Sequence, residues 1–178
     1  MKIIFLDVDG VLNIHSPSYY SAYGMVNNPM ERHLLIRLQN IIKETDAYIV
    51  LSSSWNLDSF KDKIKELNFK YQDRVLGSTQ YFYEKGTVPE ERLIIQQGTG
   101  DKFMNFRGDQ IQYWIDNTKH NVEKYVVIED EIFDVKDIIP KENIVEVNMN
   151  DGLSHQNYLD CIKILKGEKE WKKESQNT

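Results

Sequence analysis

The start of the chain constrains the fold most, because a short apolar run there ends abruptly in two carboxylates. Residues 2–6 are almost continuously apolar, which is typical of a strand buried on both faces of a parallel sheet. Asp7 follows this run directly, and Asp9 comes two residues later, just before Gly10. The pattern predicts an inner strand that carries polar chemistry at its carboxyl end.

Strand and helix patterns then alternate along the chain. Apolar residues at helical spacing predict helices over residues 30–44, 58–68, 108–118 and 154–165. Apolar runs predict further strands over residues 47–52, 74–77, 125–128 and 143–147. In the last helix we expect Ser154 at the N-cap and Leu159, Ile162 and Leu165 facing inward. This alternation indicates an α/β fold with a mainly parallel central sheet that is covered on both faces.

Composition favours one soluble domain. The 178 residues are 40% hydrophobic and 28% charged, and we expect a single domain over residues 1–166 with a polar tail over 167–178. The net charge of -6 argues against bulk binding of a polyanion through a basic face. No apolar run approaches the roughly 20 residues that span a bilayer, and no cleavable leader is evident, so we expect a cytoplasmic protein.

Cysteine and histidine offer little chemistry. The single cysteine, Cys161, cannot form an internal disulfide, and its spacing places it on the inward face of a helix. The four histidines lack the close spacing of a zinc site. We interpret them as structural or surface residues; they are His15, His33, His120 and His155.

Polar residues gather where the predicted strands end. Ligands of open parallel sheets bind beyond the carboxyl ends of the strands, and those ends carry Asp7, Asp9, Ser52 and the acidic run 129–131. Carboxylates that meet at one edge repel each other unless a hard cation neutralises them. The sequence therefore predicts a Mg²⁺ site at this edge.

The run Asp7-Val8-Asp9-Gly10-Val11-Leu12-Asn13 resembles the first motif of the haloacid dehalogenase (HAD) superfamily of phosphohydrolases. The other motifs follow in the order of that superfamily: Ser52 after a strand, Arg107 before a helix, and acidic residues after the next strand. Residues 51–55 (LSSSW) and 151–153 (DGL) are most similar to the small HAD-like domains associated with RNA repair proteins. The resemblance implies a three-layer, Rossmann-like HAD fold. The short segment between the first motif and its helix leaves no room for a large cap domain.

The resemblance also implies roles for the first motif. Asp7 would attack phosphorus and form an aspartyl-phosphate, and Asp9 would act as general acid and base. Gly10 would allow the tight path of the backbone beside the substrate phosphate. The alternative is that the two aspartates only form a turn or cap.

For the second motif, the resemblance implies that a serine hydroxyl binds a phosphoryl oxygen. Ser52 fits best because it follows the apolar run directly, while Ser53 and Ser54 stay open. Ser54 fits an N-cap or a serine turn equally well. For the cation of the third motif we choose Arg107, with Lys102 as the rival and a solvated surface arginine as the alternative.

The fourth motif is expected to hold the metal. Asp130 and Glu129 would bind Mg²⁺ together with Asp7 and the carbonyl oxygen of Asp9, with Asp134 in reserve. Glu129 departs from the superfamily pattern, which has an aspartate at this position. An acidic run on its own is more often a solvated face.

These features predict a Mg²⁺-dependent phosphomonoesterase, a hydrolase whose substrate is a nucleotide or polynucleotide end. The alternatives are a non-catalytic module that binds phosphate and Mg²⁺, and a phosphotransferase. We expect neither a membrane nor an obligate protein partner. Tyr19, Tyr20 and Tyr23 could form a flap over the site or simply pack, and residues 79–106 could fold as a small lid.

Overall fold

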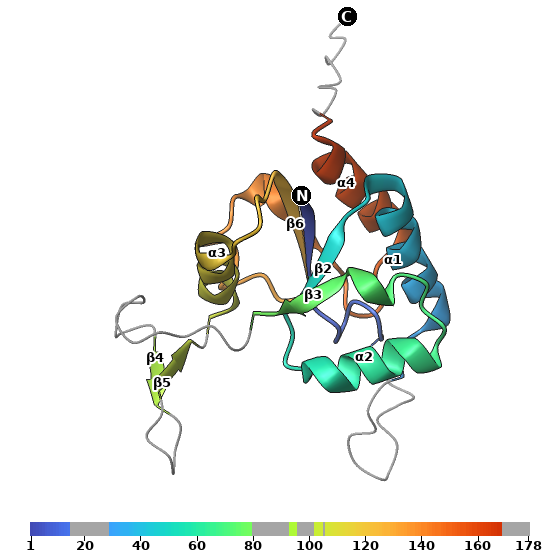
Figure 1. The fold of residues 1–178 in the computed structure, drawn as a ribbon, viewed down its shortest axis with the longest axis horizontal. Coiled ribbons are helices and arrows are strands. Elements are labelled where there is room, and N and C mark those ends of the chain that lie inside the picture. The colour runs from blue at the N-terminus through green and yellow to red at the C-terminus, as the bar shows by residue number, and fades with distance from the viewer. Residues whose placement is uncertain (15–28, 80–92, 96–101, 105, 169–178) are drawn as a thin grey trace, which may run out of the picture.

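The structure is a computed structural model that describes residues 1–14, 29–79, 93–95, 102–104 and 106–168 (Figure 1). Its main strands are β1 (Lys2–Leu6), β2 (Tyr48–Leu51), β3 (Val75–Ser78), β6 (Lys124–Glu129) and β7 (Ile144–Glu146). Its α-helices are α1 (Arg32–Thr45), α2 (Leu57–Glu66), α3 (Arg107–Asn117) and α4 (His155–Lys166). Short 3-10 turns precede two strands, at Gln72–Arg74 and Lys141–Asn143.

The five main strands form one parallel sheet in the order β3-β2-β1-β6-β7. β1 lies in the middle, pairing Leu6 with Leu51 of β2 on one side and with Ile128 of β6 on the other. Its residues 3–6 are completely buried, as the apolar run predicts. The parallel sheet expected from the sequence is thus confirmed.

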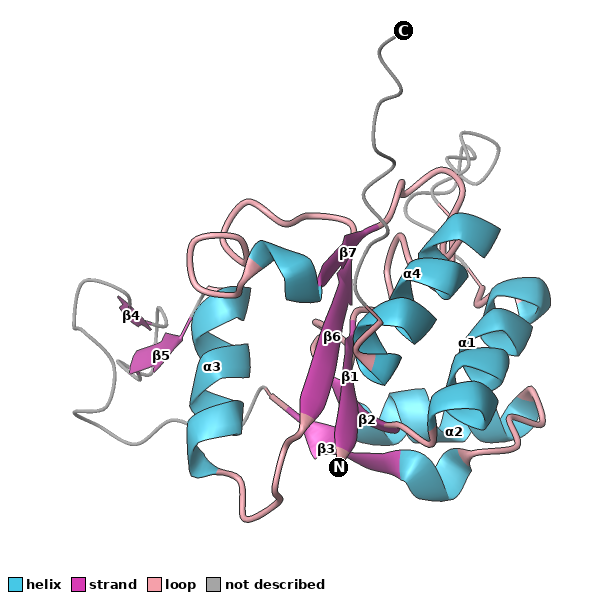
Figure 2. Cartoon of the chain, turned by 90° about the horizontal axis from the view of Figure 1, so that it is seen from above, coloured by secondary structure: helices cyan, strands magenta, loops and turns pink. Residues whose placement is uncertain are grey.

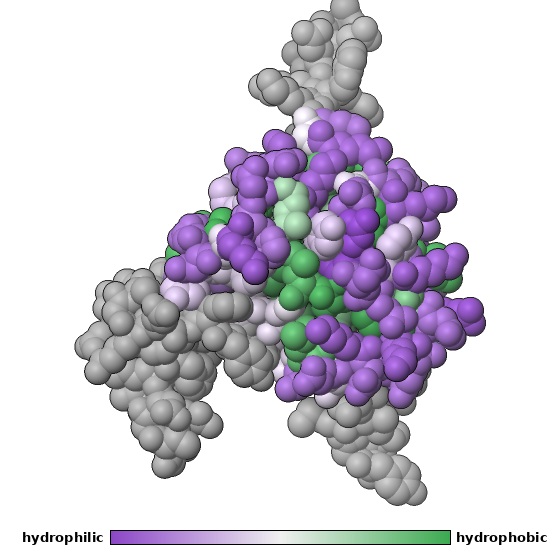
Figure 3. Space-filling view, in the orientation of Figure 1, coloured by the Kyte–Doolittle hydropathy of each residue, from purple (hydrophilic) through white to green (hydrophobic). Residues whose placement is uncertain are grey.

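Helices cover both faces of the sheet, giving three layers (Figure 2). Ile4 and Leu6 of β1 belong to a core shared with α1, α2 and α4, whereas Ile3 and Phe5 belong to a second core with α3. Successive residues of a strand point to opposite faces, so one apolar run supplies both cores. In Figure 3, hydrophilic residues cover most of the described surface on one side of the molecule.

The ends of the helices differ in part from the prediction. Helix α2 begins after Asn56, whose side chain accepts hydrogen bonds from the amides of Asp58 and Ser59, so Ser54 is not its N-cap. Helix α4 has the predicted cap at Ser154, which forms a reciprocal capping box with Asn157. The prediction that Leu159 faces inward is wrong, because it is 36% exposed.

The rotation of helix α4 about its own axis explains why Leu159 is exposed. Cys161, Ile162 and Leu165 form its buried face, and Leu159 lies on the flank of that face. No helix among the residues that the structure describes is long and apolar enough to cross a membrane.

A second, two-stranded antiparallel sheet joins β4 (Leu93–Ile95) and β5 (Lys102–Met104), and β5 contacts α3 (Figure 1). The rest of the expected lid falls mostly outside the described residues, as do the tyrosines at 19, 20 and 23 and the tail beyond residue 168. The lid, the flap, and the division into one domain and a tail therefore stay predictions.

Candidate functional site

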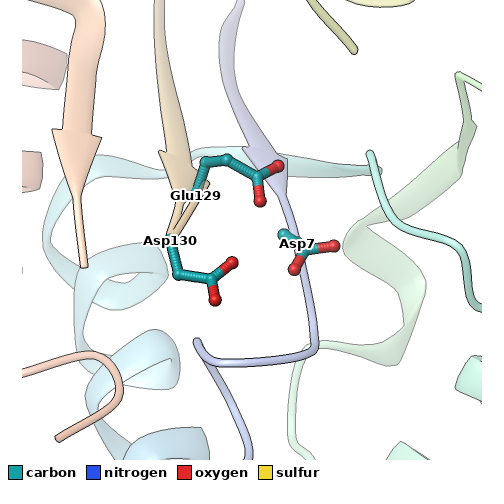
Figure 4. A group of neighbouring side chains, drawn as sticks. All are labelled: Asp7, Glu129 and Asp130. Atoms are coloured by element: carbon teal, nitrogen blue, oxygen red, sulfur yellow. The ribbon is translucent and has the colours of Figure 1, made fainter. Parts of the chain in front are cut away.

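Three carboxylates meet at the carboxyl edge of the sheet. Asp7 follows β1, Glu129 ends β6 and Asp130 comes next, and one ligand oxygen from each lies within 4.8 Å of the others (Figure 4). Asp7 is placed there by the sheet itself, because its backbone amide donates to the carbonyl of Ile128 at 3.1 Å. The meeting predicted from the sequence is therefore a product of neighbouring parallel strands.

Burial makes this cluster hard to ionise. Asp7 is 5% exposed and Glu129 is 4% exposed. Burial is the main cause that raises the pKa of Asp7 to about 7, against the opposing effect of the Arg107 guanidinium. Burial, and next the charge of Asp7, raise the pKa of Glu129 to about 9. Full ionisation of the cluster near neutral pH thus needs more positive charge than Arg107 supplies.

Arg107 is the cation nearest to these carboxylates among the described residues. Its Nη2 lies 3.8 Å from Oδ1 of Asp7, and its Nε lies 3.4 Å from Oε2 of Glu129. The guanidinium thus spans the first and fourth motifs. The rival Lys102 lies in β5, and its side chain is outside the described set.

The first turn of α3 holds Arg107 in place. Its backbone amide donates to Oδ2 of Asp134 at 2.6 Å, across the loop that follows β6. A Cβ on Gly108 would lie 2.7 Å from the carbonyl oxygen of Asp134, so only glycine allows this close approach. Asp134, predicted as a reserve metal ligand, serves here as the acceptor for the start of the helix and lies outside the cluster of three.

Gly10 makes room for Asp130. The residue has a φ of +72°, and a Cβ on it would lie 2.2 Å from Oδ2 of Asp130. Its amide donates to Oδ1 of Asn13 at 2.8 Å, which closes the loop after β1. The glycine therefore does more than permit a turn, since it lets a carboxylate of the fourth motif reach the loop of the first.

Two donors hold the carboxylate of Asp9. Nδ2 of Asn13 donates to Oδ1 at 2.8 Å, and Nε1 of Trp55 lies 3.1 Å from both carboxylate oxygens. Both residues stand within the motifs that carry the family resemblance, yet sequence reasoning gave neither a role. The polar indole nitrogen directly after a serine run at a strand end is the signal that could have found Trp55.

The three serines after β2 have different surroundings. Ser52 is 1% exposed, and its Oγ has no hydrogen-bond partner among the described residues. The hydroxyl of Ser53 donates to Asp7, which lowers the pKa of that carboxyl, and its Oγ accepts the amide of Trp55 at 3.3 Å. Ser54 is exposed and lines the cavity over the cluster.

The cavity over the cluster has a volume of about 340 Å³ and a strongly acidic lining. Six carboxylates face one guanidinium, and the other lining residues are a serine and two large apolar residues. The lining consists of Asp7, Asp9, Ser54, Arg107, Glu129, Asp130, Glu131, Phe133, Asp134 and Met149. A phosphate dianion would be repelled here unless a cation accompanied it.

The donor set fits Mg²⁺. This ion prefers oxygen ligands and is usually held by one or two carboxylates with several waters. The three clustered carboxylates offer such oxygens, and Oε2 of buried Glu129 has no hydrogen-bond donor among the described residues. The site therefore contains oxygen ligands for a divalent cation and more carboxylates than the single guanidinium of Arg107 can neutralise once they are ionised.

No curated protein matches this chain. A family model does, and it is described as the HAD domain in Swiss Army Knife RNA repair proteins. The match covers residues 3–158, from β1 into α4, and so includes the carboxylate cluster, Arg107 and the serines. With the parallel three-layer fold, this match confirms the resemblance found in the sequence. The chain belongs to the family of HAD domains in Swiss Army Knife RNA repair proteins.

Proposed function

We propose that this chain is a Mg²⁺-dependent phosphomonoesterase that forms an aspartyl-phosphate on Asp7. The observation that carries the proposal is the buried meeting of Asp7 with Glu129 and Asp130 beside Arg107. Membership of a HAD family supports the same chemistry. One edge of the sheet thus offers groups that can serve as nucleophile, metal ligands and cation for the phosphate.

The metal would be held by Asp7, Glu129, Asp130 and the backbone carbonyl of Asp9. When bound, Mg²⁺ supplies positive charge that offsets the carboxylates and the phosphate dianion. The hydrogen bond from Ser53 favours the ionised form of Asp7 and opposes part of the rise in pKa that burial causes. Arg107 attracts the phosphate and limits the freedom of Asp7.

The reaction would proceed in two displacements. In the first, a carboxylate oxygen of Asp7 attacks phosphorus, the bond from phosphorus to the ester oxygen breaks, and Asp9 donates a proton to that oxygen. In the second, Asp9 takes a proton from water as the water oxygen attacks phosphorus. The bond to Asp7 then breaks, inorganic phosphate leaves, and Asp9 is protonated again.

Serines and Gly10 complete the proposed phosphate site. Ser54 lines the cavity, and the hydroxyl of Ser52 is buried at the end of β2 with no hydrogen-bond partner in the part of the chain that the structure describes. One hydroxyl of this serine run would donate to a phosphoryl oxygen, and that of Ser54 is the one that lines the cavity. Gly10 has no side chain to restrict the approach of the phosphate to the loop.

We propose a nucleotide or a polynucleotide end as the substrate. The family to which the chain belongs is described from RNA repair proteins, where phosphorylated strand ends are a natural target. The segment between Asn13 and Pro29 is too short for a large cap, so a bulky end can be accommodated. Screening phosphorylated RNA, nucleotides, sugar phosphates and phosphopeptides tests this assignment, which fails if only non-nucleotides are hydrolysed.

The first experiment measures phosphate release from an aryl phosphate with Mg²⁺ and with a chelator. The native protein is compared with Asp7→Asn, Asp9→Asn and the control Asp62→Asn, which alters an exposed carboxylate on α2. We expect Mg²⁺-dependent release that Asp7→Asn abolishes, that Asp9→Asn lowers by about a hundredfold or more, and that the control leaves unchanged.

Other outcomes point to the alternatives. Folded native protein that binds Mg²⁺ but releases no phosphate from any member of the substrate screen would indicate a non-catalytic binding module. Transfer of phosphate to an added alcohol in preference to water would indicate a phosphotransferase. Release that persists in Asp7→Asn would remove Asp7 from the role of nucleophile.

A further inference from the structure

An exposed aromatic residue stands at the candidate site. The side chain of Phe133 is 63% exposed, and it lines the cavity over the carboxylate cluster. Exposed apolar residues are common on protein surfaces and need no explanation when they are scattered singly. The position of this one beside the proposed phosphate site makes it different.

The loop that carries Phe133 is firmly anchored directly after this residue. Val135 and Ile139 are almost completely buried in the core beneath α3. Asp134 accepts the amide of Arg107, and the amide of Ile139 donates to the carbonyl of Val135 at 2.8 Å. The exposure of Phe133 is thus a property of a well-held turn and not of a loose end.

Phe133 also gives the cavity its apolar character, together with Met149. These two are the only large apolar residues in the described lining, which otherwise consists of six carboxylates, Arg107 and Ser54. Met149 follows β7 and Phe133 follows β6, so neighbouring strand ends supply both side chains. A ligand at this site therefore meets a charged part and an apolar part.

A nucleotide has the same two parts. We propose that Phe133, which lines the cavity together with Met149, stacks on the nucleobase next to the phosphate that Asp7 attacks, an inference that rests on the proposed function. Base stacking on an aromatic side chain tolerates any sequence, because every base has a flat π face. Phe133 is then a specificity residue that favours nucleotides over other phosphate esters.

The test compares substrates that differ only in the base. Phosphate release is measured for 5′- and 3′-nucleoside monophosphates and for the corresponding ribose phosphates, with the native protein, Phe133→Ala and Phe133→Trp. We expect Phe133→Ala to lower kcat/KM for nucleotides about tenfold, mainly through KM, and to change ribose phosphates less than twofold. Phe133→Trp should restore the preference for nucleotides. Ile36→Ala, which removes an exposed apolar side chain on α1, is the control and should change neither.

The outcomes separate this inference from the proposed function. Equal loss on nucleotides and ribose phosphates, or no loss on either, overturns the stacking role while leaving phosphatase activity intact. If the native protein hydrolyses none of these compounds, the proposed function on nucleotides fails. Calorimetric binding of the same nucleotides then decides the inference: weaker binding by Phe133→Ala supports it, and unchanged or absent binding overturns it.

Discussion

At the scale of single residues, the contacts of Asp9 explain how a general acid and base could be held in place. Nε1 of Trp55 is equidistant from the two carboxylate oxygens of Asp9, and Asn13 adds a second donor to Oδ1. Oδ2 therefore has more free acceptor capacity and is the natural oxygen to carry a proton. In the proposed mechanism, the two donors would fix the orientation of Asp9 while it gains and loses that proton.

Replacing Trp55 should therefore impair the chemical step more than binding. In Trp55→Phe the ring body stays while the N–H is lost, and we expect kcat to fall about tenfold with KM within about twofold. Alkyl phosphates, whose leaving groups need a proton, should lose more activity than p-nitrophenyl phosphate. Trp114→Phe makes the same change in the other core. This control should leave the ratio of the activity on alkyl phosphates to that on p-nitrophenyl phosphate unaltered. Equal losses on both substrates would contradict the positioning role.

Gly10 provides a second test at this scale, directed at the metal. Because a Cβ would overlap the carboxylate of Asp130, Gly10→Ala must push Asp130 away or distort the loop. We expect the Mg²⁺ concentration for half-maximal binding to rise about tenfold, since disturbing the groups that orient a metal ligand commonly costs this much metal affinity. Calorimetric titration measures it. Gly77→Ala is the matched control, because a Cβ there meets nothing within 4 Å. Equal Mg²⁺ affinity in the two variants would contradict the role of Gly10 in placing Asp130 as a metal ligand.

At the scale of elements, the hydrogen bond at the start of α3 both stabilises the helix and positions Arg107 at the candidate site. Asp134→Ala removes the acceptor for the amide of Arg107, so we expect the free energy of unfolding to fall by about 1 kcal/mol, as for other lost helix caps. Asp134→Asn keeps an acceptor oxygen and should lose less. Denaturant unfolding measures both, with the exposed Asp137→Ala in the same loop as control. Identical stability of Asp134→Ala and the control would contradict the capping role.

The elements also show what the sequence could and could not predict. The apolar runs predict the five strands of the main sheet to within one or two residues, because strands buried on both faces leave such continuous runs. The sequence left Ser54 open as a cap of α2, because Ser54 and Asn56 are both good caps and only the backbone path selects Asn56. The contact of Trp55 with Asp9 spans 46 residues and depends on the twist and register of two strands. The serine run marks Trp55 as a residue near the site, but it does not reveal that Asp9 is the partner of the indole.

At the scale of the whole molecule, charge connects the site to stability. The chain carries a net charge of -6, and several of its carboxylates line one cavity with a single guanidinium. Folding therefore brings like charges together at this edge of the sheet. Without a cation, protonation of Asp7 and Glu129 is the way to relieve that repulsion, as their raised pKa values indicate.

The metal-free protein should consequently become less stable as pH rises. In the folded protein the pKa values of Asp7 and Glu129 are about 7 and about 9, whereas their ordinary values are 3.8 and 4.5. At any pH between the ordinary and the folded pKa of a group, the folded state therefore binds more protons than the unfolded chain. The free energy of unfolding then falls with pH across this window, and full stability is kept only below it.

Mg²⁺ held at this cluster would favour the ionised carboxylates and reverse this loss, so the rise in Tm on adding Mg²⁺ should be larger at pH 8 than at pH 5. Thermal unfolding at both pH values, with Mg²⁺ or a chelator, measures this difference. Other titrating groups change Tm equally with and without Mg²⁺, so their effects cancel when the two Tm values at one pH are subtracted. Glu129→Gln should flatten the pH dependence of the metal-free protein, because one raised pKa is removed. An equal effect of Mg²⁺ at both pH values would mean that the ion binds away from these carboxylates, and the metal assignment would then have to be abandoned.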